Sequence, residues 1–176
     1  MKKKFLALST LFFLTAGCVA MEPIEVREGI YGRGVPVITQ SFASPKIRPG
    51  DTWKVYLKAS DPDGDMRYIV SVIEQPGMGI YPVSYTRIAE GNRKDLSGYI
   101  FLTTIDVQGL NLVNLSLTVQ IQDRAGHYSK PVSFPLSFNH TYRQELPPAD
   151  AFPEKNLGPI MIGLRTLGDG TGGVLR

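Results

Sequence analysis

The chain has 176 residues, of which 43% are hydrophobic, so it is long enough for one domain with a real core and short appendages. Its formal net charge of +3 comes from the first four residues. Without Lys2, Lys3 and Lys4, the chain holds 16 basic and 16 acidic residues. The charge therefore gives no reason to expect a nucleic-acid partner or an anionic surface as a partner. A single cysteine excludes an internal disulfide and any zinc site that needs several cysteines.

The first 17 residues have the layout of a secretory signal peptide. A basic start is followed by an apolar run at 5–14, which is shorter than the ~20 residues of a membrane-spanning helix, and then by small residues. The run ends in Leu14-Thr-Ala-Gly-Cys18, which resembles the lipobox of bacterial lipoproteins. The resemblance implies that Cys18 is lipidated and anchors the chain in a membrane. An ordinary signal peptide with a chance cysteine is the alternative.

The residue after Cys18 bears on the location of the protein. It is Val19 and not aspartate, and by resemblance to Gram-negative lipoproteins this favours the periplasmic face of the outer membrane. Residues 18–34 mix charged residues, proline and glycine without a sustained period, so we expect a tether between the lipid and the domain.

Residues 35–140 predict a domain made of strands. Thr52 to Ala59 and Leu115 to Gln122 alternate apolar and polar residues, the pattern of half-buried strands, and no segment is a convincing amphipathic helix. Turns rich in Gly, Pro and Asp separate the segments, which favours an all-β, single seven-stranded sandwich. The seven expected strands are 35–42, 52–59, 66–73, 80–88, 99–105, 115–122 and 132–138.

Residues 141–176 are expected to form an extended arm rich in proline and glycine. Residues 160–167 are a candidate for one more strand, and 168–176 for a flexible end. Such an arm can add to the sheet edge of a partner or pair with its own domain.

Two turn segments within 35–140 resemble those of bacterial immunoglobulin-like domains of the cadherin-like and related groups. The first is Ala59-Ser-Asp-Pro-Asp-Gly-Asp65 and the second is Gln122-Asp-Arg-Ala-Gly-His-Tyr-Ser129. The resemblance implies an immunoglobulin-like sandwich with both loops at one end. The Cys…Trp…Cys framework of antibody domains is absent, since Trp53 stands without cysteines.

The first of these turns contains the best candidate metal ligands. Asp61, Asp63 and Asp65 alternate along the loop, and Asp123 in the second turn is expected to approach them, so the four carboxylates are a candidate calcium site. The alternative is that Asp-Pro-Asp-Gly is only favourable turn chemistry, in which case no cofactor is needed. An EF-hand is excluded because Val72 occupies the twelfth place of the loop.

No catalytic residue is predicted. His127 and His140 are the only histidines, the chain lacks Gly-x-Ser-x-Gly and His-x-x-x-His motifs, and both histidines are expected to be surface turn residues. Tyrosines on or near strands either stack on sugars or are ordinary sandwich residues. They are Tyr81, Tyr85, Tyr99, Tyr128 and Tyr142.

These features predict a non-catalytic, lipid-anchored lipoprotein of the cell envelope that acts as a protein-binding or assembly module. Its partners would be the membrane, through Cys18, and an envelope protein. The alternative is a calcium-dependent adhesion or carbohydrate-binding domain.

Overall fold

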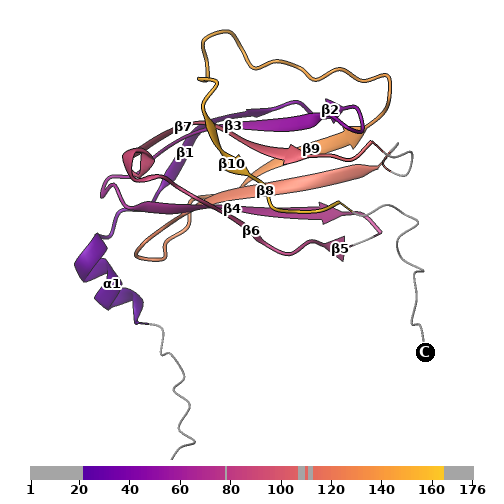
Figure 1. The fold of residues 1–176 in the computed structure, drawn as a ribbon. Coiled ribbons are helices and arrows are strands. Elements are labelled where there is room, and N and C mark those ends of the chain that lie inside the picture. The colour runs from indigo at the N-terminus through magenta and orange to yellow at the C-terminus, as the bar shows by residue number, and fades with distance from the viewer. Residues whose placement is uncertain (1–21, 78, 107–109, 111–112, 165–176) are drawn as a thin grey trace, which may run out of the picture.

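The computed structural model describes residues 22–77, 79–106, 110 and 113–164 of the chain. The expected signal peptide, the lipidation residue Cys18 and the expected flexible end at 168–176 lie outside these residues. The described part forms one α-helix, α1 (Ile24–Tyr31), one 3₁₀ helix, η1 (Glu90–Asn92), and ten strands (Figure 1). Its helices include none that is both long and apolar enough to cross a membrane.

The strands form two sheets. The first holds, in spatial order, β1 (Val37–Ala43), β3 (Thr52–Ser60), β7 (Asp95–Thr103) and β10 (Asn156–Pro159). The second holds β2 (Lys46–Ile47), β9 (Val132–Phe138), β8 (Asn114–Asp123) and β4 (Met66–Gln75), with β5 (Gly79–Ile80) and β6 (Ser84–Arg87) both paired to β4. The pairs are antiparallel except β10 with β7 and β2 with β9. The predicted all-β, two-sheet architecture is therefore confirmed.

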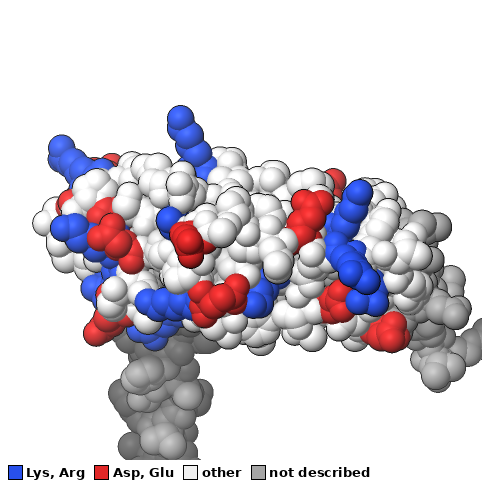
Figure 2. Space-filling view, turned by 90° about the horizontal axis from the view of Figure 1, so that it is seen from above, with Lys and Arg blue, Asp and Glu red and all other residues white. Residues whose placement is uncertain are grey.

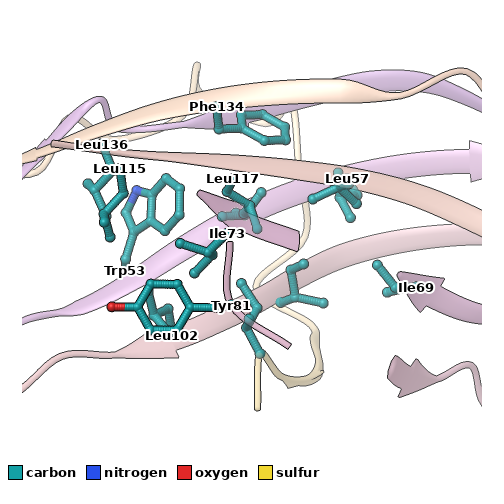
Figure 3. Close-up of a cluster of buried hydrophobic side chains, with 14 of the residues drawn as sticks. Trp53, Leu57, Ile69, Ile73, Tyr81, Leu102, Leu115, Leu117, Phe134 and Leu136 are labelled. Carbon is teal, nitrogen blue, oxygen red and sulfur yellow. The ribbon is translucent and has the colours of Figure 1, made fainter. Parts of the chain in front are cut away.

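The core lies between the two sheets (Figure 3). The alternation predicted for β3 and β8 is present, because the predicted inward residues of both strands are 5% exposed or less. Trp53 is fully buried and donates its indole N–H to the carbonyl of Ser44 at 2.7 Å, so its one polar atom is satisfied inside the core. The inward set comprises Trp53, Val55, Leu57, Ala59, Leu115, Leu117, Val119 and Ile121.

The structure has ten strands among the described residues and not the predicted seven, and most boundaries shift by one to four residues. The segment at 80–88 is split into β5 and β6, because Pro82 lies between them and has no N–H for the ladder. The turn at 45–50 contains the two-residue strand β2, which pairs with the end of β9. The strand predicted at 99–105 begins four residues earlier and ends two residues earlier, since β7 is Asp95–Thr103.

The expected tether at 18–34 contains helix α1, which the sequence did not predict. The helix has only eight residues and none of them is buried, so it lacks the long core-facing stripe by which a helix is recognised. Pro23 precedes the helix with the φ that suits a helix start, and Gly32 ends it at φ +103 while donating its N–H to Glu28 at 2.9 Å. The helix lies at one end of the sheets (Figure 1), where Glu28 contacts His127 and Tyr31 contacts Arg124.

The C-terminal arm returns to its own domain. Glu154 accepts hydrogen bonds from Lys54 at 2.6 Å and Tyr56 at 2.5 Å, and Phe152 packs on the Tyr56 ring at a centroid distance of 5.6 Å. Burial and Glu154 raise the pKa of Tyr56 well above its usual range. The arm then forms β10 beside β7, so its strand lies at 156–159 and not within the described part of 160–167. Of the two expectations for the arm, pairing within the chain is the one observed (Figure 1).

Charged residues on one broad face of the molecule are mixed in sign. Figure 2 shows Lys and Arg side chains interspersed with Asp and Glu across this face, with no large area of one sign. This agrees with the near balance of acidic and basic residues in the sequence.

Candidate metal centre

Three carboxylates meet at the end of the domain where β3 passes to β4 and β8 turns toward β9. Asp61 and Asp65 come from the first connection and Asp123 from the end of β8, and one oxygen of each lies within 4.8 Å of the others. All three are buried, with Asp61 2%, Asp65 8% and Asp123 2% exposed. Met66 pairs with Asp123 in the second sheet, so the strand register brings the two loops together. The structure therefore brings together three of the four predicted ligands.

Asp61 divides its two oxygens between a turn and the centre. Oδ1 accepts the backbone N–H of Asp63 at 2.8 Å and of Gly64 at 3.3 Å, and Gly64 takes φ +72 to close the turn. Oδ2 is shielded from solvent and accepts no hydrogen bond from the described residues. A buried carboxylate oxygen without a donor is costly, because it has lost its water and gained nothing in exchange.

Asp65 and Asp123 are held by backbone donors. Asp65 Oδ2 accepts the N–H of Arg124 at 3.0 Å. Asp123 Oδ1 accepts the N–H groups of Gly126 at 2.6 Å and His127 at 2.8 Å. These bonds fix the positions of both carboxylates before any ligand arrives, which is the condition for a preformed site.

Asp63 does not belong to the centre, which corrects the prediction of four ligands. Its side chain is exposed, and its Oδ2 accepts the backbone N–H of Gly34 at 2.5 Å. A Cβ at Gly32 would lie 2.2 Å from the same oxygen, so the glycines after α1 leave the space that this carboxylate occupies. Asp63 is therefore a link to the N-terminal segment.

His127 is not the surface turn residue that the sequence suggested. Its side chain is only 14% exposed, and its ring lies between Asp123 Oδ2, 2.8 Å from Nδ1, and Glu28 Oε1, 3.0 Å from Nε2. The hydrogen bond with Glu28 is the largest influence raising the pKa of His127, while burial opposes it and Asp123 adds to it. Arg33 pairs with the other Glu28 oxygen at 3.3 Å. His140, by contrast, is exposed in a turn as expected.

The electrostatics of the centre favour a positive charge. Burial is the largest influence raising the pKa values of Asp61 and Asp65, and the charge of Asp123 raises both further. Three carboxylates this close repel one another unless a proton or a cation compensates them. Oxygen ligands of this kind suit a hard divalent cation such as calcium.

Sequence reasoning missed the partners that surround the centre. Glu28 contacts His127 from 99 positions away, and Gly34 contacts Asp63 from 29 positions away. The spacing of Asp123 and His127, four residues apart in one turn, is the only local signal that could have found part of this network.

The tyrosines considered for sugar stacking differ in exposure and do not share one surface. Tyr81 is buried, and Tyr99 packs against Tyr56 with Lys54 over its ring. Only Tyr85 and Tyr128 are strongly exposed, at 53% and 44%. They lie on different segments, one in β6 and one after β8.

No family model matches the chain, and none of the curated proteins searched matches it.

Proposed function

We propose that this chain is a non-catalytic, lipid-anchored protein of the cell envelope whose immunoglobulin-like domain is a calcium-dependent binding module. Asp61, Asp65 and Asp123 would hold the cation. The observation that carries the proposal is the buried Asp61 Oδ2, which has no hydrogen-bond donor among the described residues and belongs to a group of converging carboxylates. A cation supplies the positive partner that this oxygen lacks.

Calcium suits the centre better than magnesium does. Calcium takes roughly six to eight oxygen ligands in flexible geometry, whereas magnesium demands a near-ideal octahedron and keeps most of its water. Three carboxylates from two loops offer an irregular, partial set that waters or backbone carbonyls would complete. The two-sheet architecture and the shared end of the two Asp-bearing loops support the immunoglobulin-like assignment within the same proposal.

The cation would stiffen the end of the domain. It would join the connection between β3 and β4 to the turn after β8. Asp123 in turn holds His127 in place through hydrogen bonds with its backbone N–H and its ring. His127 contacts Glu28 on α1, so the docking of the helix depends on the same network. The non-catalytic part is supported by this use of His127 and by Ser129, whose hydroxyl donates to Lys130 and accepts from Ile121.

Thermal unfolding of the full chain in detergent, in EDTA and in rising calcium, tests the proposal. Calcium at ~100 times its dissociation constant should raise the melting temperature by about 5–10 °C. Asp61→Asn and Asp65→Asn should abolish this shift, and each should leave the EDTA melting temperature equal or higher because one repelling charge is removed.

Asp63→Asn is the matched control, because it removes the same charge from the same loop outside the centre. It should keep the calcium shift. An unchanged melting temperature of the wild-type chain in calcium, or an equal loss of the shift in Asp63→Asn, would reject the calcium site.

The lipid anchor rests on the signal segment and Cys18. Mass spectrometry of the protein purified from a Gram-negative host should find Cys18 as the first residue, with attached acyl chains. Cys18→Ser should abolish acylation and leave the protein in the soluble fraction of the envelope. Sedimentation of the wild-type protein with inner-membrane vesicles would contradict the outer-membrane location.

A second candidate function is the protein-binding or assembly role. Ile80 and Met161 are 71% and 74% exposed, and Val83 and Tyr85 are also strongly exposed. The Met161 N–H bonds to Ser84, so the arm lies beside the β5–β6 segment that carries the other three. Capture of an envelope protein should fail in Ile80→Lys/Met161→Lys and persist in Leu146→Lys, whose residue is 84% exposed elsewhere on the arm.

A further inference from the structure

A cavity of about 440 Å³ lies between the N-terminal segment and the second sheet, next to the metal centre. Five arginines line it together with two tyrosines and one acid, Glu22. The arginines come from five places in the fold, which are α1, the start of β4, the end of β6, the segment after η1 and the turn after β8. In the same order they are Arg27, Arg67, Arg87, Arg93 and Arg124.

Backbone pairing holds three of these arginines close together. The N–H of Met66 donates to the carbonyl of Arg93 at 3.2 Å, and the N–H of Ile88 donates to that of Arg67 at 2.9 Å. Arg87 is opposite Tyr68 in the β4–β6 ladder. The β4–β6 ladder and the loop after η1 therefore bring the backbones of Arg67, Arg87 and Arg93 close together.

Stacking fixes two of the guanidinium groups. Arg67 lies over the ring of Tyr68 at 5.0 Å and Arg124 over the ring of Tyr31 at 5.6 Å, both measured to the ring centroid. Both tyrosines also line the cavity. Stacking leaves the edge of a guanidinium free to donate, because the ring contacts only its face.

The positive charge in the cavity is largely uncompensated. Arg93 pairs with Glu90 at 3.4 Å, whereas the other four arginines have no ion pair within the described ranges. Arg27 Nε and Arg93 Nε are also shielded from solvent and lack an acceptor among those residues. Buried donors of this kind are costly until an acceptor reaches them.

We propose that this cavity is a binding site for a phosphate-bearing ligand, either a small phosphorylated molecule or a phosphorylated headgroup. Guanidinium groups bind phosphate through paired hydrogen bonds, and a phosphoryl group has enough oxygens to accept from several arginines at once. The volume lies within the range of about 300–1,000 Å³ that is typical of small-ligand sites. The two buried Nε groups would gain the acceptors that they lack.

Titration with inorganic pyrophosphate tests the proposal. The full chain is held in detergent and EDTA, with sodium chloride at matched ionic strength as the reference, so the result does not depend on calcium binding. Pyrophosphate should raise the melting temperature and bind measurably by calorimetry. Arg67→Gln/Arg87→Gln should weaken binding by about tenfold or more, because each arginine contributes a charged hydrogen bond.

The double variant should fold normally, since Arg67 and Arg87 are both exposed. Arg48→Gln/Arg143→Gln is the matched control, because it removes the same charge from exposed residues that do not line the cavity. It should change the pyrophosphate affinity by less than about twofold.

Two further titrations identify the source of the phosphate. Mixed micelles containing phosphatidic acid are compared with micelles of phosphatidylcholine, and an oligoglutamate peptide stands for an acidic protein segment. Stabilisation by pyrophosphate identifies a small phosphorylated molecule, and stabilisation by phosphatidic acid alone identifies a headgroup. No response to either, a preference for oligoglutamate, or equal losses in the two double variants would overturn the proposal.

Discussion

The candidate metal centre and the arginine cavity are neighbours of opposite charge that do not neutralise each other. Asp123 and Arg124 are adjacent in sequence and Asp65 and Arg67 are two residues apart, yet no ion pair joins the two groups within the part of the chain that the structure describes. The reason lies in the backbone. Arg124 gives Asp65 its N–H, while its guanidinium stacks on Tyr31 in the cavity.

Arg67 is kept apart from the carboxylates by an irregularity in the pairing of β4 with β8. Met66 pairs with Asp123 and Tyr68 with Gln122, so the register shifts at Arg67, which has no paired residue in β8. A bulge of this kind changes the direction of a strand and its side chains. One end of this small domain therefore holds carboxylates and guanidinium groups that do not pair with each other, so both groups stay available to the ligands proposed for them.

The largest expected effect is from Asp123→Ala. Asp123 accepts two backbone N–H groups and contacts the His127 ring, so its loss leaves buried donors without acceptors. We expect a loss of about 3–5 kcal/mol in the free energy of unfolding, measured by urea denaturation. If Asp123→Ala is no less stable than the wild type, the centre does not organise this end of the domain.

A smaller effect is expected from Gly126→Ala, which perturbs the junction of the two regions. Gly126 has φ +100, and an added Cβ would lie 2.7 Å from Arg27 Nη1. The backbone strain should cost about 1–3 kcal/mol, and displacement of Arg27 should weaken pyrophosphate binding as well. Limited proteolysis should show faster cutting within residues 22–34.

Gly29→Ala is the control for this substitution. Gly29 lies within α1, and an added Cβ would meet nothing within 4 Å. It should make α1 more stable by about 0.5–1 kcal/mol and slow the same proteolysis. Faster cutting in both variants would indicate that the helix is not docked through Gly126.

The pH dependence of stability separates the roles of His127 and the carboxylates. The pKa of His127 is raised in the folded protein, so its contribution to stability is complete below its ordinary value of 6.5 and is lost as the pH rises through the folded value. His127→Gln should therefore flatten the fall in melting temperature that begins near pH 6.5 in EDTA. A fall that is unchanged in this variant would remove His127 as its cause.

The carboxylates act in a lower window with the same sign. The pKa values of Asp61 and Asp65 are raised above the ordinary 3.8, so their contribution is complete below that value and is lost as the pH rises through the folded values. Calcium should remove this loss, and its stabilising effect should therefore be larger at pH 7 than at about pH 4. An equal calcium shift at both values would contradict the assignment.

The smallest expected effect on stability is that of Arg67→Gln, a substitution in the lining of the cavity. Arg67→Gln should change the free energy of unfolding by less than about 0.5 kcal/mol without an anion, because the side chain is exposed and has no ion pair among the described residues. Its effect should emerge only on pyrophosphate binding. A large loss of stability without ligand would make Arg67 a structural residue.

Local patterns carried most of the fold prediction. The alternation in β3 and β8 identified their inward faces correctly, and the range predicted for β9 coincides with Val132–Phe138. These predictions succeeded because the side chains of a strand alternate between its two faces, so consecutive residues alone show the pattern. The split at Pro82 and the two-residue strand β2 were missed, because such short pairings depend on neighbouring strands.

The site was predictable only in part. That Asp123 meets the loop of Asp61 and Asp65 followed from the two loops sharing one end of a sandwich. Asp63 was placed in the same group because its spacing resembles that of its neighbours, whereas its side chain turns toward Gly34. The spacing of residues on a loop does not determine the direction of each side chain.

The sequence by itself determined the two-sheet β architecture, the core faces of the long strands and the Asp-rich turns, since all of these depend on local periodicity and turn chemistry. Only the tertiary structure decided that α1 docks on His127, that the arm pairs with β7 and that five separated arginines share one cavity. Those contacts join residues that are far apart in the chain. They follow from how the strands cross between the two sheets, which no local pattern encodes.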